Sequence, residues 1–99
     1  MYARTIVADV VPGKAEEAVR IFEEQIVPVI KEQPGFIGTA IYLDVDKKKA
    51  QTVSFWESKQ AMESTSQGSP YLSKVTGMLR SCIVNRQYDQ WEVGFSTDR

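Results

Sequence analysis

Apolar residues recur along the chain with two different periods, and each change of period marks a predicted element. A two-residue alternation, typical of β-strands, covers residues 2–11, 36–43, 50–57 and 82–93. A three- to four-residue recurrence, typical of helices with one apolar side, covers residues 14–33 and the segment after Ser69-Pro70. Residues 58–66 are expected to form a short helix capped by Ser58, and Ser69 is expected to cap the helix that follows it. The predicted order is therefore β-α-β-β-α-β.

This order is that of the ferredoxin-like fold, an α+β arrangement in which helices cover one face of a four-stranded antiparallel sheet. We expect one domain over residues 1–99, of which residues 94–99 form a tail. Strand 2–11 is apolar on both of its faces, so the sheet face without helices would also be apolar. Such a face favours a partner. We therefore predict a homodimer that packs sheet against sheet through the open sheet face and closes into a dimeric α/β barrel.

A proline lies inside the long helical pattern. Pro28 has no N–H to donate, and its ring clashes with the preceding turn. The sequence therefore predicts a kink or a short break at this point of helix 14–33.

Composition excludes several classes of function. Lys and Arg number 12 against 13 Asp and Glu, so no basic excess indicates nucleic-acid binding. No apolar run approaches the roughly 20 residues of a membrane span. The single cysteine, Cys82, cannot form an internal disulfide, which favours a reducing, cytoplasmic setting, and we expect a buried thiol at a strand end. The chain has no histidine, which excludes Ser-His-Asp and Cys-His catalysis. Without histidine, and with no tight carboxylate cluster beyond Asp44 and Asp46, we expect no metal.

The strand over residues 50–57 carries the candidate chemistry. Thr52, Ser54 and Trp56 share one face, while Val53 and Phe55 share the other. An indole beside two hydroxyls, at a turn from strand to helix, suits the floor of a pocket for a flat ligand. The alternative is that Trp56 is an ordinary core aromatic, and the pattern leaves both interpretations open.

Three lysines, residues 47–49, lie between two predicted strands. They are either the solvated tip of a hairpin or a weak phosphate-binding signal. The same fold binds RNA in some proteins, but residues 50–57 lack the basic and glycine positions of that signature, so RNA binding is not expected.

Two motifs resemble those of a known family. Pro34-Gly35-Phe36-Ile37-Gly38 resembles a P-G-F-x-G motif, and the segment from Trp56 to Met62 resembles a W-x-S-x-[EQ]-A-[FYM] block. The family is that of the antibiotic biosynthesis monooxygenases, and the order of elements agrees over residues 2–93. The resemblance implies a dimeric ferredoxin-like α/β barrel.

Members of this family oxidise polycyclic phenols or quinols with molecular oxygen and no cofactor, while others degrade haem. The haem-degrading branch uses an Asn on the first strand and a Trp and a His on later helices. This chain has Thr65 near the Trp position and Val75 or Thr76 at the His position, and its first strand contains no Asn. The resemblance therefore does not predict haem degradation.

The cofactor-free branch supplies candidate site residues. Trp56 matches its Trp, whereas Thr52 replaces its Asn, Met62 its Tyr, and Thr76 lies near its Arg. The resemblance implies that Trp56 stacks a ring. The catalytic candidates are Trp56, Thr52, Lys74 and Arg80, where either cation replaces the Arg and stabilises an anion. The substrate-binding candidates are Ser54, Tyr42, Met62 and Thr76.

Two functions follow from the resemblance. The first is a cofactor-independent monooxygenase that acts on a small quinol, polyphenol or polycyclic aromatic. The alternative is a non-catalytic dimeric member that binds a small aromatic ligand or is purely structural. The retained Trp56 favours the first, and the replaced Asn, Tyr and Arg positions favour the second.

Overall fold

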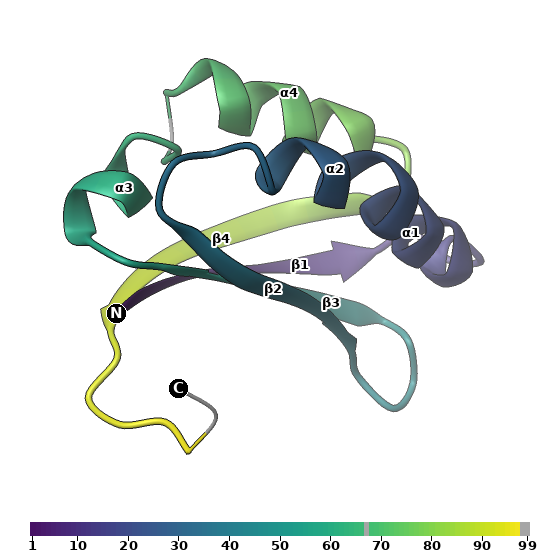
Figure 1. Ribbon diagram of the computed structural model, residues 1–99. Helices are drawn as coiled ribbons and strands as arrows, with labels where there is room; N and C mark the ends of the chain where they lie inside the picture. The colour runs from purple at the N-terminus through teal and green to yellow at the C-terminus, as the bar shows by residue number, and fades with distance from the viewer. Residues whose placement is uncertain (67, 98–99) are drawn as a thin grey trace.

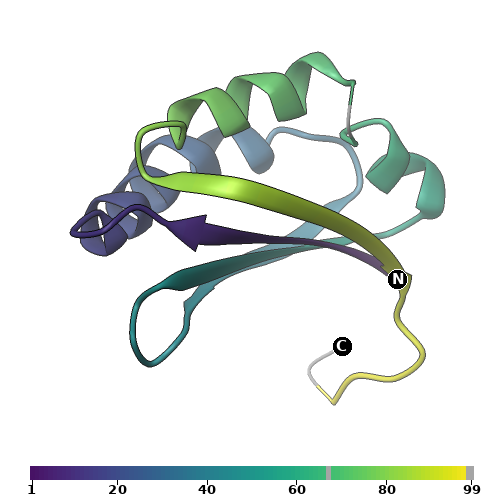
Figure 2. The ribbon, with the colours of Figure 1, turned by 180° about the vertical axis from the view of Figure 1, so that it is seen from behind.

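Figure 1 shows the computed structural model of the chain, which describes residues 1–66 and 68–97. A four-stranded antiparallel sheet has the strand order β2-β3-β1-β4 and carries the helices on one face, as the view from behind also shows (Figures 1 and 2). The strands are β1 (Tyr2–Val10), β2 (Phe36–Leu43), β3 (Lys49–Trp56) and β4 (Ile83–Glu92). The predicted ferredoxin-like fold is confirmed. Within the chain the sheet is not closed, since β2 and β4 form its two edges.

The long first helix is interrupted in front of Pro28. It consists of α1 (Ala15–Ile21), a π-helical turn η1 (Phe22–Ile26) and α2 (Val27–Ile30). The wide turn is closed by the Val27 N–H, which donates to the Phe22 carbonyl. Pro28 follows directly in the first turn of α2 and, having no N–H, cannot continue the helical hydrogen bonds to the preceding turn. The predicted irregularity is therefore a π-bulge, a feature common at functional sites.

The two shorter helices begin at serine caps. The Ser58 hydroxyl accepts a hydrogen bond of 3.1 Å from the Ala61 N–H at the start of α3 (Lys59–Glu63). Ser69 does the same for Leu72, also at 3.1 Å, at the start of α4 (Pro70–Met78). Each bond satisfies one of the free N–H groups at a helix start. Both predicted caps are present.

A glycine of the first motif allows the turn between α2 and β2 to lie against α3. Gly35 has a φ of +80°, and a Cβ built on it would lie 2.5 Å from the Ala61 Cβ. Its carbonyl accepts a 2.8 Å hydrogen bond from the Glu57 N–H at the end of β3. The Pro-Gly-Phe motif and the Trp block therefore meet in space.

The lysine segment forms the tip of the β2–β3 hairpin. The Asp44 carboxylate accepts hydrogen bonds from the backbone N–H groups of Lys48 at 2.7 Å and Lys49 at 3.0 Å, which closes the turn. The Lys49 ammonium pairs with Asp9 at 2.7 Å. Residues 44–49 are exposed, which agrees with a solvated tip.

Paired residues define the two faces of the sheet. Thr39, Ser54, Arg4 and Gln90 form one row across the four strands, on the side of the helices. The neighbouring row lies on the opposite face and contains Gly38, Phe55, Ala3 and Trp91. Further along, Tyr42 pairs with Gln51 on this open face. Tyr42 and Trp91 are about half exposed, at 55% and 54%.

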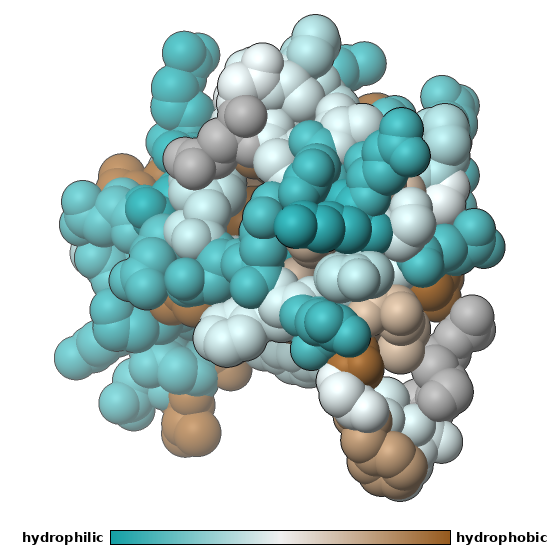
Figure 3. Space-filling view, turned by 90° about the vertical axis from the view of Figure 1, so that its left-hand side faces the viewer, coloured by the Kyte–Doolittle hydropathy of each residue, from teal (hydrophilic) through white to brown (hydrophobic). Residues whose placement is uncertain are grey.

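Beyond β4 the chain leaves the sheet. Residues 94–97 form no helix or strand and hang below the sheet in Figure 1. In the side view the surface is largely hydrophilic, and hydrophobic colour gathers on the part that projects at the bottom (Figure 3). Phe95, 84% exposed, belongs to this tail. Within the two described segments, none of the helices has the length and apolar character that crossing a bilayer requires.

Candidate functional site

The indole of Trp56 is completely buried, with 0% of its surface exposed. It packs with Ile30 and Met62 beneath α3, and the Phe36 ring meets it edge-on at a centroid distance of 5.7 Å. Its Nε1 donates a 2.9 Å hydrogen bond to the Ser54 hydroxyl. Burial of this kind is that of a core aromatic whose polar edge fixes a neighbouring side chain.

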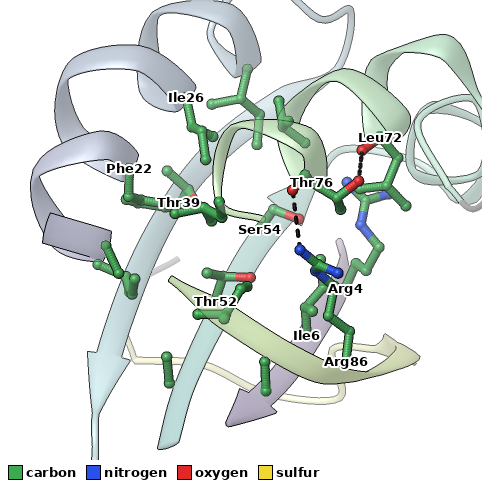
Figure 4. A pocket seen from close by; sticks show the side chains of 18 of the residues that line it. Arg4, Ile6, Phe22, Ile26, Thr39, Thr52, Ser54, Leu72, Thr76 and Arg86 are labelled. Atoms are coloured by element: carbon green, nitrogen blue, oxygen red, sulfur yellow. Dashed lines mark hydrogen bonds between the residues drawn. The ribbon is translucent and has the colours of Figure 1, made fainter. Parts of the chain in front are cut away.

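A cavity lies next to this cluster, between the helix side of the sheet and the helices above it (Figure 4). Its volume is about 50 Å³. Aliphatic and aromatic side chains make up much of its wall, among them Ile6, Phe22, Ile26, Ile41, Leu72 and Val75. Its polar wall consists of Arg4, Thr39, Thr52, Ser54, Tyr71, Thr76 and Arg86. Phe22 and Ile26 come from the π-helical turn, so the bulge shapes the cavity.

Two wall residues indicate that the cavity reaches solvent. Ile6 and Thr52 pair with each other on the central strands β1 and β3, and both point to the covered side of the sheet. Residues at such positions are usually buried completely. Both residues are only partly buried here, so the helix layer does not cover them completely.

The first arginine of the cavity, Arg4, is only 3% exposed. Its Nη1 donates to the Met62 carbonyl at 3.1 Å and to the Thr65 hydroxyl at 2.9 Å. The guanidinium lies 5.4 Å from the centroid of the Trp56 ring, a cation–π distance. Burial lowers the pKa of Arg4 from its ordinary value, but guanidinium groups stay charged in proteins. Its Nε is buried without a hydrogen-bond partner.

The second arginine, Arg86, reaches over from the edge strand β4. Its Nη2 donates to the Thr76 carbonyl of α4 at 3.1 Å, which Figure 4 shows as a dashed line. Its Nε is also buried and unpartnered. Within the described residues neither arginine forms a salt bridge, and the wall of the cavity contains no Asp or Glu.

The hydroxyl groups of the wall differ in whether they are free to donate a hydrogen bond to a ligand. Thr39 and Thr76 donate their hydroxyl protons to backbone carbonyls, each at 2.8 Å. Among the described residues Ser54 only accepts a bond, from Trp56, and therefore keeps its proton for a ligand. Thr52 makes no side-chain hydrogen bond within the part of the chain described. Burial raises the pKa of Tyr71 to about 12, so its hydroxyl also stays protonated.

The structure brings together only some of the residues suggested by the sequence. Thr52, Ser54 and Thr76 line the cavity. Trp56 and Met62 lie beside it in the core and do not line it. The other three lie elsewhere: Tyr42 is on the opposite face of the sheet, and Lys74 on α4 and Arg80 after it are exposed.

Sequence reasoning missed Arg4, Arg86 and Tyr71. A signal for Arg4 was present, because it shares the face of its strand with Ile6 and Ala8, where a charge is unusual. Arg86 carried no such signal. Alternation places it on the same side of β4 as Tyr88 and Gln90, but that side carries polar residues in any case, so Arg86 did not stand out as Arg4 does.

Cys82 lies outside this site. Its side chain is completely buried just before β4, as predicted, and its thiol donates to a Glu17 carboxylate oxygen at 3.2 Å. Burial raises the pKa of Cys82, which keeps the thiol protonated and unreactive at neutral pH.

The family model for antibiotic biosynthesis monooxygenases matches residues 1–74, most of the chain. The protein belongs to this family. Among curated proteins, no sequence matches the chain.

Solved structures of similar proteins agree in fold. SnoaB, a cofactor-independent oxygenase from Streptomyces nogalater, is 14% identical with a TM-score of 0.78, and the match covers 99% of this chain and 97% of SnoaB. The monooxygenase ActVA-Orf6 of Streptomyces coelicolor, in complex with nanaomycin D, is 17% identical with a TM-score of 0.80, covering 96% and 88%. A putative antibiotic biosynthesis monooxygenase from Deinococcus radiodurans is 12% identical with a TM-score of 0.75, covering 97% and 95%. At these identities the likeness shows the shared fold.

Proposed function

We propose that the protein is a cofactor-independent monooxygenase that oxidises a small quinol, polyphenol or polycyclic aromatic with molecular oxygen. The observation that carries the proposal is the cavity, whose apolar wall suits an aromatic ring and whose polar wall presents hydrogen-bond donors. Two similar structures support it, because one is a cofactor-independent oxygenase and the other holds nanaomycin D.

In the proposed reaction a phenol and O2 give a quinone and water. The phenol loses a proton, the resulting anion passes one electron to O2, and the two radicals combine at a ring carbon. Loss of water from this peroxide leaves the second carbonyl. One oxygen atom enters the product and the other leaves as water, so the electrons balance without a cofactor.

The roles of the side chains follow from the hydrogen-bond donors and the charge that each can present to a ligand. Thr52 and Ser54 donate hydrogen bonds to the phenolic oxygen, and Trp56 orients Ser54 through its indole N–H. One of the two guanidinium groups, that of Arg4 or Arg86, stabilises the developing anion, the role for which the sequence suggested Lys74 or Arg80. The cavity wall has no carboxylate to act as a base, so the phenol gives its proton to solvent water, and the guanidinium promotes this loss by lowering the pKa of the bound phenol. The peroxide anion takes a proton back before water leaves.

The size of the cavity favours a second function, non-catalytic binding of a molecule smaller than an aromatic ring. Its volume of about 50 Å³ is well below the about 150 Å³ of an engineered protein cavity that admits benzene. Turnover of an aromatic substrate therefore requires the cavity to widen beside Ile6 and Thr52.

The homodimer belongs to the same proposal. Tyr42, Phe55 and Trp91 give the open face of the sheet an apolar surface that a second copy would cover. Sedimentation equilibrium at micromolar concentration should give twice the chain mass of 11.2 kDa. A clean monomer would contradict the dimeric barrel. The cytoplasmic location expected from the single cysteine stays a prediction.

Oxygen uptake by the purified, metal-free protein tests the activity. A panel of quinols and polyphenols is assayed with wild type, Thr52→Val and Arg86→Gln, with Lys31→Gln on the exposed side of the turn after α2 as control. Uptake above the buffer rate that falls in both cavity variants and not in the control supports the oxygenase. If no compound is consumed but some bind, the binding function is the better account.

A further inference from the structure

Two positive charges face one small cavity, and nothing in its wall balances them. Arg4 and Arg86 are the only charged groups among the described residues that line it. Neither pairs with a carboxylate, and each has a buried Nε–H without an acceptor. Buried charges are normally paired, and an unsatisfied buried donor is costly.

A purely structural role explains only part of this arrangement. A guanidinium has five N–H donors. Arg4 uses Nη1 to join β1 to the end of α3, and Arg86 uses Nη2 to join β4 to α4. Such tethers need one nitrogen each. Among the described residues no acceptor pairs with the remaining nitrogens, and both arginines line the cavity.

The uncharged donors of the wall point to the same chemistry. Ser54, Thr52 and Tyr71 keep their protons available, whereas Thr39 and Thr76 have given theirs to carbonyls. A wall rich in donors, with two cations and no anion, is complementary to an oxyanion. A planar carboxylate suits arginine best, since its two oxygens accept parallel N–H bonds.

We infer that the cavity takes a ligand that is already an anion at neutral pH, carrying a carboxylate or an equally planar oxyanion against Arg86 and Arg4. The rest of the ligand contacts the apolar wall around Phe22 and Leu72. This inference deepens the proposed function, since it names a carboxylated or otherwise anionic aromatic as the substrate class. It requires no turnover, so it can be tested by binding alone.

The test compares benzoate with benzamide, which has nearly the same shape but no charge. Isothermal titration or ligand-induced change in melting temperature is measured at low ionic strength for wild type, Arg86→Gln and Lys31→Gln. Benzoate should bind wild type roughly ten- to hundredfold more tightly than benzamide, the worth of a hydrogen bond to a charged group. Arg86→Gln should remove most of this preference. Lys31→Gln, which removes an equal charge from an exposed position, should keep it.

Acetate is the third probe, because it suits a cavity of this volume without any widening. Acetate binding that depends on Arg86, with no benzoate binding, supports the anion site and counts against an aromatic substrate. Equal binding of benzoate and benzamide overturns the anion site and leaves the proposed oxygenase standing. Failure of both benzoate and acetate to bind also overturns the anion site. The wild-type ratio decides the question even if Arg86→Gln does not fold, and Arg86→Lys then serves as a variant that keeps the charge.

Discussion

Replacement of Trp56 by Ala should remove much of the stability of the fold. The indole is fully buried against Ile30 and Met62, its edge is bonded to Ser54, and its face lies under Arg4. Truncating a buried Trp costs roughly 3–5 kcal/mol through lost contacts and the cavity that remains. The total stability of a domain this size is about 5–15 kcal/mol, so Trp56→Ala should leave a marginal fold.

Urea unfolding and thermal unfolding followed by far-UV circular dichroism measure this loss. At roughly 4–8 °C per kcal/mol for a small domain, the melting temperature should fall by about 12–40 °C. Phe95→Ala is the matched control, because it removes an aromatic ring that is 84% exposed, and it should change stability by less than about 0.5 kcal/mol. A Trp56→Ala loss as small as that of the control would refute the core assignment.

Trp56→Phe separates the core role from contact with a ligand. It keeps most of the ring volume and removes the N–H that fixes Ser54. Because the indole does not line the cavity, benzoate affinity should change less than tenfold. A complete loss of binding in a folded Trp56→Phe protein would instead place the ring against the ligand.

Three further outcomes are expected. Gly35→Ala should cost roughly 1–3 kcal/mol in urea unfolding, because its new Cβ meets Ala61, and should cost more than Gly13→Ala, which has the same φ and open space. Ser58→Ala should cost about 1 kcal/mol through loss of the α3 cap, measured in the same way. Between about pH 10 and pH 12 the unfolding free energy should fall, because unfolded tyrosine loses its proton near pH 10 and the pKa of folded Tyr71 is raised to about 12.

For each of these three predictions a different result would contradict the reasoning. Equal losses at the two glycines would show that backbone strain, and not contact with α3, sets the requirement for glycine. An unchanged stability in Ser58→Ala would mean that water caps α3 equally well. For the alkaline effect, Tyr71→Phe is the comparison, and a slope equal to that of wild type would assign the loss of stability to other groups.

The sequence by itself determined the fold and several local features. Hydrophobic period, Pro-Gly breaks and Ser caps are local signals, because the backbone geometry that they reflect spans only a few residues. They gave the β-α-β-β-α-β order, the caps at Ser58 and Ser69, and the irregularity at Pro28. Strand alternation also placed Thr52 and Ser54 on one face, and both line the cavity.

Only the tertiary structure decided which charges belong to the site. Arg4 and Arg86 are far apart in sequence, on strands that flank each other only after the sheet has formed. In the packed structure Trp56 lies in the core beside the cavity, and Lys74 and Arg80 are exposed to solvent. Burial is a property of the whole assembly of helices on the sheet, so a short stretch of sequence cannot determine it.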